Sequence, residues 1–168
     1  MHNYYFRLSC AEDVPDLCRI SAEARLRYRT FPSLAHIAEA PALAPVRFEA
    51  CRVVVALDSN SHKIIGFAAM RPLDGLLYLD NISVCPSASG IGAKLLSAAI
   101  EHAESLGVQA VSLTTFREPP WNGPWFRKHG FLTMPGAYIG EGLKQVMDRQ
   151  RVTLDATTRE TLWRVLHD

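Results

Sequence analysis

The sequence predicts a single domain of mixed α/β (α+β) class, with a central sheet of about six to seven strands flanked by helices. The 168 residues are 48% apolar, which is enough for one continuous core. Residues 51–84 contain three β-rich runs joined by short turn-forming connectors, a pattern typical of an antiparallel meander. A helical pattern over 91–107 then leads to a β-branched run at 108–116, which predicts a β-α-β unit. No repeat or linker interrupts the sequence, so we expect one domain over residues 1–168.

The N-terminal third is predicted to form one strand and two helices. Residues 4–9 alternate weakly between polar and apolar side chains, as in a strand. Asp13 and Pro15 are an N-cap and a first-turn proline, so they open a helix that runs to Tyr28. A second short helix begins near Ser33 and is broken by the prolines that follow it.

The middle of the chain carries the clearest periodicity. Strands are expected at 51–58, 63–71 and 76–84. The apolar residues of the next helix fall on one face, and Gly107 is placed to end it. Because that helix separates the third strand from 108–116, these two strands should run parallel in a right-handed crossover.

The C-terminal part is predicted to add two helices and two strands. Residues 121–130 form a short helix with Asn122 as its cap. A strand follows at 131–134, then a helix over 143–150 and a last strand around 160–166.

Composition argues against several classes of function. Eighteen basic and seventeen acidic residues give a net charge of +1 without a basic run, which argues against a nucleic acid partner. The N-terminus has no long apolar segment, so we expect neither a secretory signal nor a membrane helix, and hence a cytoplasmic protein. The four cysteines form no C-x-x-C pair and the six histidines form no ligand pair, so we expect free thiols and no metal.

The stretch VCPSASGIGAKLL, residues 84–96, joins a predicted strand to a predicted helix. Unpaired N–H groups at a helix start attract anions, and Gly90 and Gly92 would let a phosphate approach the backbone. Positive φ angles or close packing explain the two glycines equally well. The spacing does not match a P-loop, and a dinucleotide site would need a third glycine.

Residues 77–131 resemble the GNAT family of acyl-CoA-dependent N-acetyltransferases. The features that match, in order, are a strand that ends V-x-P, the glycine turn, a helix with L-L, another strand, and an N-x-P-aromatic-aromatic segment followed by G-F. The resemblance implies a GNAT fold and an acyltransferase. Acetyl-CoA would be the cosubstrate, and its acetyl group would pass directly to a primary amine of an unidentified small molecule, peptide or protein. The family is often dimeric, so a homodimer is left open.

The resemblance also implies which residues contact acetyl-CoA. The backbone of the strand at 76–84 would hold the pantetheine arm, and the turn with the first helical residues would hold the pyrophosphate. Asn122 matches an asparagine near the pantetheine, and Phe126 occupies the position beside the thiol. The implied cofactor-binding residues are Ile82, Ser83, Val84, Ser89, Gly90, Ile91, Gly92, Ala93, Lys94, Asn122 and Phe126.

The chain departs from the family pattern at two points. The turn PSASGIG is about two residues shorter than usual and carries no Gln or Arg, which predicts weaker CoA binding, with Lys94 or Arg127 compensating. Phe126 replaces a tyrosine that often protonates the departing thiolate, a loss on the order of 10²–10⁴-fold. These departures keep a second hypothesis open, in which an impaired GNAT-like module binds CoA as a sensor or interaction domain.

Three residues are candidates for proton transfer. The amine must lose its proton before it can attack a thioester, and Asp80, in an otherwise apolar strand, is the first candidate for the base. An ion pair with Arg71 or Arg117, or a solvated strand end, would explain it equally. Glu118 is the second candidate, with capping as its alternative. Tyr138 would donate a proton to the leaving thiolate, or be a structural phenol.

For several other residues a functional role and a purely structural role both explain the sequence. Tyr78 binds substrate or packs in the core, and Cys85 beside the turn is better explained as a small filler than as a nucleophile. An aromatic cluster either walls an acceptor pocket or belongs to the core, and its members are Phe116, Trp121, Trp125, Phe126 and Phe131.

Overall fold

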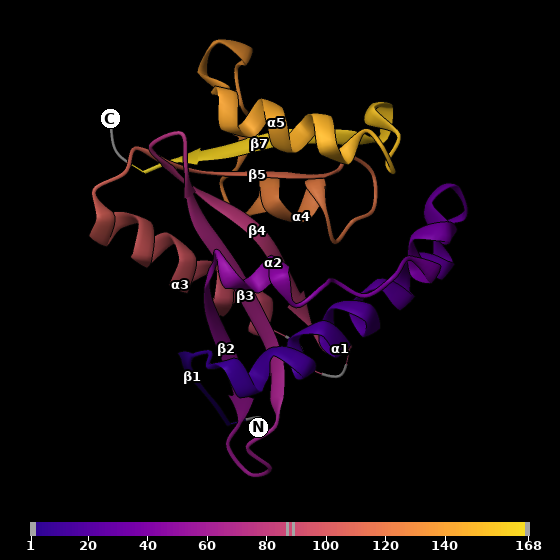
Figure 1. Ribbon diagram of the computed structural model, residues 1–168, viewed down its shortest axis with the longest axis vertical. Helices are drawn as coiled ribbons and strands as arrows, with labels where there is room; N and C mark the ends of the chain where they lie inside the picture. The colour runs from indigo at the N-terminus through magenta and orange to yellow at the C-terminus, as the bar shows by residue number, and fades with distance from the viewer. Residues whose placement is uncertain (1–2, 87, 89, 167–168) are drawn as a thin grey trace. The chain divides into compact units, whose positions relative to one another are not determined.

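The computed structural model describes residues 3–86, 88 and 90–166, and its seven strands form one mixed sheet (Figure 1). The strand order is β1-β2-β3-β4-β5-β7-β6, and β4 and β5 run parallel. The strands are β1 Tyr4–Leu8, β2 Arg52–Asp58, β3 Ile64–Leu73, β4 Leu76–Val84, β5 Ala110–Phe116, β6 Leu132–Thr133 and β7 Arg159–Val165. The α-helices are α1 Val14–Ala24, α2 Val46–Glu49, α3 Ile91–Leu106, α4 Gly123–Lys128 and α5 Glu141–Gln150. The predicted fold class is therefore confirmed, and so is the parallel crossover through α3.

The chain divides into two compact units. The first contains residues 1–71 and 80–99, and the second contains residues 72–79 and 100–168. Strand β4 contributes residues to both units.

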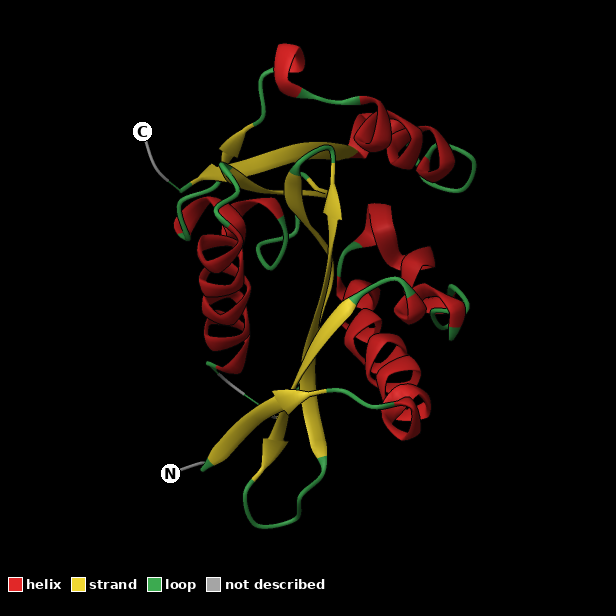
Figure 2. Ribbon diagram, turned by 60° about the vertical axis from the view of Figure 1, so that its left-hand side comes forward, coloured by secondary structure: helices red, strands yellow, loops and turns green. Residues whose placement is uncertain are grey.

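The core of the first unit lies between α1 and strands β2 and β3. Leu17 and Ile20 of α1 are fully buried, and they pack with Val53 and Val55 of β2 and with Phe67 of β3. Alternate residues of β2 therefore face α1, as the period of a strand requires. The first half of α3 lies on the opposite face of these strands (Figure 2).

The segment after α1 differs from the predicted helix. The α-helix ends at Ala24, and residues 25–30 and 32–39 form 3₁₀ helices. Pro32 explains the break between them, because a residue before proline is disfavoured in helical conformation, and Phe31 is extended with φ −117° and ψ 99°. The prediction of a continuous helix to Tyr28 was wrong in this respect.

The second unit is built on β5, β7 and β6, which pair antiparallel, with α5 and α4 on opposite sides of β5 and β7 (Figure 1). Leu143 and Val146 of α5 are buried with Tyr78 and Trp163. Asp74, in the turn between β3 and β4, caps α5 from a distance: its carboxylate accepts hydrogen bonds from the backbone N–H groups of Gly142 (2.8 Å) and Leu143 (2.9 Å). This cap satisfies two of the unpaired donors at the helix start.

Candidate active site

The last residues of β4 and the glycine turn lie together in the first unit. Ile82, Ser83 and Val84 end the strand, and the Ser83 hydroxyl donates to Asn81 Oδ1 at 2.6 Å. The chain then turns, with the Ala88 N–H bonded to the carbonyl of Cys85 at 2.9 Å. The structure thus brings the predicted pantetheine strand directly to the predicted pyrophosphate turn.

The turn combines an exposed glycine with the start of a long helix. Gly90 is exposed with φ +80°, and a Cβ built there would meet no atom within 4 Å. Ile91 anchors the start of α3 in the core, Gly92 and Ala93 add no bulk, and Lys94 is exposed. The first N–H groups of a helix have no partner within it, so the start of α3 offers backbone donors next to this turn. Ser89, which the sequence also assigns to the turn, lies outside the described residues.

Asp80 sits beside two arginines of the same unit. Its Oδ2 accepts a hydrogen bond from Arg47 Nη2 of α2 at 3.0 Å, and its Oδ1 lies 4.0 Å from Arg71 Nε. The carboxylate is only 10% exposed, whereas Arg47 is 46% exposed. The sequence pointed to Arg71 as a partner but gave no sign of Arg47, which comes from the segment whose structure was hardest to predict.

The cysteines near this region are poor nucleophiles. All four cysteines are free thiols. Burial, with a smaller contribution from Asp80, raises the pKa of Cys51 to about 11, and burial together with the nearby Glu23 carboxylate raises the pKa of Cys85. Both side chains pack against the core of the first unit. Cys85 therefore has the environment of a space-filling residue.

In the second unit, Asn122 precedes α4 and Phe126 lies within it. Asn122 stands at the N-cap position, but its side chain makes no cap hydrogen bond; instead its carbonyl accepts from the Phe126 N–H at 3.0 Å. The prediction of Asn122 as the N-cap residue is confirmed, although its side chain makes no capping hydrogen bond. Phe126 is 5% exposed and meets Phe131 edge to face, with ring centroids 5.5 Å apart. Its ring is therefore held by aromatic packing.

The remaining candidates of the second unit are exposed. Glu118 lies on the surface between β5 and α4. Tyr138 is 58% exposed, and its ring lies 5.0 Å from that of Trp163. Arg127, expected to compensate for the short turn, already donates to the buried Glu160 at 2.5 Å and to Thr133 at 2.9 Å. The guanidinium of Arg127 is therefore already paired with a carboxylate of the same unit.

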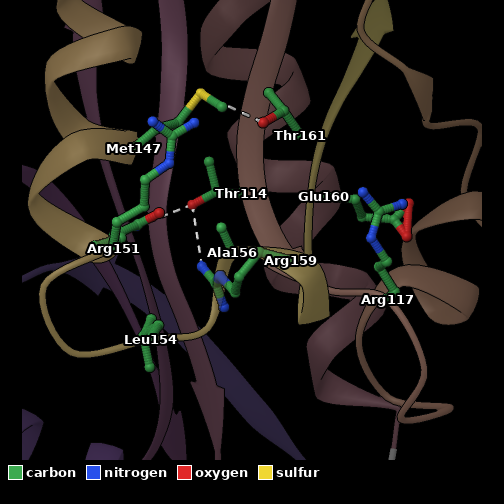
Figure 3. Close-up of a pocket in the computed structure, with 10 residues that line it drawn as sticks. Thr114, Arg117, Met147, Arg151, Leu154, Ala156, Arg159, Glu160 and Thr161 are labelled. Carbon is green, nitrogen blue, oxygen red and sulfur yellow. Dashed lines mark hydrogen bonds between the residues drawn. The ribbon is translucent and has the colours of Figure 1, made fainter.

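A cavity of about 230 Å³ opens in the second unit between α5 and the ends of β5 and β7 (Figure 3). We call it the arginine cavity. Its lining residues are Thr114, Arg117, Met147, Gln150, Arg151, Leu154, Ala156, Arg159, Glu160 and Thr161.

Thr114 is the hydrogen-bonding centre of this cavity. Its hydroxyl lies 3.0 Å from Gln150 Nε2, 3.2 Å from Arg159 Nη2 and 3.2 Å from the phenol oxygen of Tyr78. Tyr78 is 2% exposed, so it supports the cavity floor from within the core. Sequence analysis identified Tyr78 but none of the lining residues except Arg117, because their patterns in the sequence are those of ordinary polar surface.

Among the described residues, no group of three or more His, Cys, Asp or Glu side chains is arranged to hold a metal ion. Within the same part of the chain, no helix has the length and apolar character needed to cross a membrane.

Comparison with known proteins gives a consistent assignment. Residues 18–131 match the sequence model of the acetyltransferase (GNAT) family. A GNAT-family acetyltransferase from Staphylococcus aureus superposes with a TM-score of 0.70 at 14% identity, over 98% of this chain and 100% of that one. The PaiA N-acetyltransferase of Thermoplasma acidophilum, solved with coenzyme A, gives a TM-score of 0.67 at 15% identity, over 97% and 99% of the two chains.

A longer protein also contains this fold. The N-acetylglutamate synthase of Neisseria gonorrhoeae, solved with coenzyme A and N-acetyl-glutamate, gives a TM-score of 0.67 at 18% identity. The match covers 99% of this chain but only 36% of the synthase chain. At these identities the likeness concerns the fold.

Proposed function

Because the chain belongs to the GNAT family of acetyltransferases, we propose that it transfers an acetyl group from acetyl-CoA directly to the primary amine of an acceptor. Two structural neighbours were solved with coenzyme A, which supports this choice of cosubstrate. The observation that carries the proposal is the turn before α3. An exposed glycine at φ +80°, with free space where a side chain would lie, precedes the N–H groups of a helix that runs from Ile91 to Leu106.

The residues of this turn and its strand fit the group that they would hold. Backbone groups of Ile82, Ser83 and Val84 would bind the pantetheine arm, and the N–H groups from Gly90 onward would bind the pyrophosphate. Asn122 and Phe126 would line the path of the arm near the thiol. Acetyl-CoA, when bound, supplies a thioester: the amine nitrogen forms a bond to the carbonyl carbon, the carbon–sulfur bond breaks, and CoA leaves with its electron pair.

The proposed proton acceptor is Asp80. An ammonium group has no lone pair, so one proton must leave the nitrogen before attack. The carboxylate lies beside two arginines, and an incoming ammonium can compete with the half-exposed Arg47 for it. Glu118 remains the second candidate for this base. Tyr138 is the proposed donor to the thiolate, and its exposure also lets water serve that purpose.

We further propose that the two units act as one catalytic domain over residues 1–168, since β4 supplies residues to both. The cytoplasm is the proposed compartment.

Two measurements on the full chain test the function. Calorimetry with acetyl-CoA measures binding, and a thiol-release assay with a panel of primary amines measures transfer. We expect binding and amine-dependent release. Binding without release from any amine would favour the CoA-binding sensor module, and absence of both would remove the acetyl-CoA assignment.

A further inference from the structure

We propose that Arg47 and Arg25 bind a carboxylate of the acceptor while Asp80 takes its ammonium group, so that the substrate is a small zwitterion such as an amino acid. This proposal rests on the acetyltransferase function proposed above, with Asp80 as the base. All three residues belong to the first unit, and so do the glycine turn and the end of β4. We call these three residues the Arg–Asp cluster.

The ion pair between Arg47 and Asp80 has the two charges that an amino acid needs for its own groups. Arg47 Nη2 of α2 donates to Asp80 Oδ2 of β4 at 3.0 Å. An acceptor ammonium that replaces Arg47 on this carboxylate leaves the guanidinium without its partner. A carboxylate on the same acceptor, a few bonds from the ammonium, supplies a new one. A zwitterion therefore replaces both halves of the pair, whereas a plain amine replaces only one.

Arg25 makes it more costly to leave Arg47 unpaired. It lies half-buried at the end of α1, and its Nη1 donates to the backbone carbonyls of Ala40 (3.5 Å) and Pro41, which hold the side chain in place. Burial, and then the charge of Arg47, lowers the pKa of Arg25, so the two guanidinium groups are near enough to repel each other. Arginine stays charged at neutral pH, so an anion that contacts both groups relieves this repulsion.

The carboxylates of the neighbouring segment do not neutralise the Arg–Asp cluster. Glu23 and Glu39 accept from other arginines, at 3.0 Å and 3.2 Å. In the described part of the chain, no carboxylate forms an ion pair with Arg25. Asp80 itself is shared, because Arg71 Nε lies 4.0 Å from its second oxygen. The positive charge around Asp80 therefore exceeds the negative charge, and a substrate carboxylate balances it.

The Arg–Asp cluster also lies close to the proposed path of acetyl-CoA. Asp80 comes two residues before Ile82, the first of the strand residues proposed to hold the pantetheine arm. Two residues along a strand separate their Cα atoms by roughly 6–7 Å. An amine bound at Asp80 is therefore within reach of a thioester that lies along the end of β4. The base, the carboxylate site and this part of the cosubstrate path all belong to the first unit.

Matched pairs of amines test the proposal. Initial rates of thiol release are measured with alanine, methionine and glutamate, with the α-carboxamide of each, and with ethylamine. We expect kcat/KM to be about tenfold higher for each acid than for its amide, with ethylamine poorest. An α-carboxamide makes its amine less basic, so the supply of neutral amine favours the amide and cannot produce this result. Equal rates for acids and amides, or a preference for ethylamine, would overturn the proposal while leaving the acetyltransferase function intact.

Variants link the preference to the Arg–Asp cluster. Arg47→Gln should lower kcat/KM about tenfold for the acids without lowering it for the amides, and Arg47→Lys should recover part of the preference. Arg25→Gln should reduce the preference in the same direction.

The matched control is Arg29→Gln, which removes an exposed arginine of the same segment that pairs with Glu39. It should keep the preference for acids. A merely structural role of Arg47 would lower the rates with acids and amides alike, which contradicts the proposal; melting curves identify any variant that fails to fold.

The two proposals fail in different ways. If no amine supports thiol release, the acetyltransferase function fails. Calorimetric titration of the full chain with glutamate then tests the Arg–Asp cluster alone, with wild type, Arg47→Gln and Arg29→Gln compared. Binding that only Arg47→Gln loses supports the carboxylate site, and equal behaviour of the three proteins overturns it.

Discussion

The glycine turn of the first unit and the arginine cavity of the second both present hydrogen-bond donors, but they do so by different means. In the turn the donors are the first backbone N–H groups of α3, which follow Gly90 at φ +80°. In the cavity the donors are side chains, and neighbours such as Thr114 and Phe116 hold Arg159 in place. A substitution in the turn should therefore act through backbone geometry, and one in the cavity through charge.

The largest effect is expected at Asp80, which tests whether the first unit contributes chemistry as well as binding. Asp80→Asn removes the proposed base, so kcat/KM should fall by roughly 10²–10⁴-fold. The affinity for acetyl-CoA, measured by calorimetry, should stay the same because the turn is untouched. Activity close to wild type would show that Asp80 is only an ion-pair partner.

The matched control for this variant is Arg47→Ala. It breaks the same 3.0 Å ion pair but leaves the carboxylate in place. Its loss of activity should be far smaller than that of Asp80→Asn. Similar losses in the two variants would assign the effect to the ion pair.

A smaller effect is expected at Gly90, which tests whether the backbone conformation of the turn determines the affinity for acetyl-CoA. Alanine at φ +80° carries a strain of about 1–2 kcal/mol, and its relief would rotate the N–H groups away from the anion. Gly90→Ala should thus weaken acetyl-CoA binding about 5- to 30-fold by calorimetry.

Gly107, at the other end of α3, provides a matched control. It has φ +71° and, like Gly90, nothing within 4 Å of an added Cβ. Gly107→Ala should cost similar stability, because the backbone strain is comparable, and leave the affinity for acetyl-CoA unchanged. If Gly90→Ala and Gly107→Ala weaken acetyl-CoA binding equally, the stability of α3, and not the conformation of the turn, controls the affinity.

The difference between the two regions also explains how far sequence analysis could reach. The strands were predicted to within two residues of their observed bounds, and helix α3 with its terminal Gly107 was predicted too. These elements depend on patterns between near neighbours in the chain. The glycine turn could be predicted for the same reason, because its strand, its glycines and its helix follow one another directly in the sequence.

The side-chain contacts of the site depend on residues far apart in the chain. Arg47 and Asp80 are 33 residues apart, and Thr114 and Arg159 are 45 apart. No local pattern relates such residues, and an arginine on a surface strand has the same sequence signature whether or not it lines a cavity. The fold and the turn could therefore be predicted, whereas the arginine cavity could not.

A more modest effect is expected at Asp74, which supports the wall of the cavity. Asp74→Ala removes the two hydrogen bonds at the start of α5 and should cost about 1 kcal/mol of the free energy of unfolding. Because the substitution leaves the turn before α3 untouched, the affinity for acetyl-CoA should not change. Urea denaturation and calorimetry measure these effects. A change in acetyl-CoA affinity alone would contradict the separation of the two regions.

The smallest effect concerns the acid stability of the unit that carries the turn. A bidentate hydrogen bond from Arg7 holds the pKa of the buried Asp13 at about 2, below its ordinary 3.8. The folded pKa is the lower one, so the pair stabilises the protein fully above about pH 4 and loses this contribution as the pH falls towards 2. Arg7 is 40% exposed, so about 1 kcal/mol is expected. Urea denaturation should show Asp13→Asn less stable than wild type at pH 7, with the difference disappearing as the pH falls through 2; a constant difference would contradict the linkage.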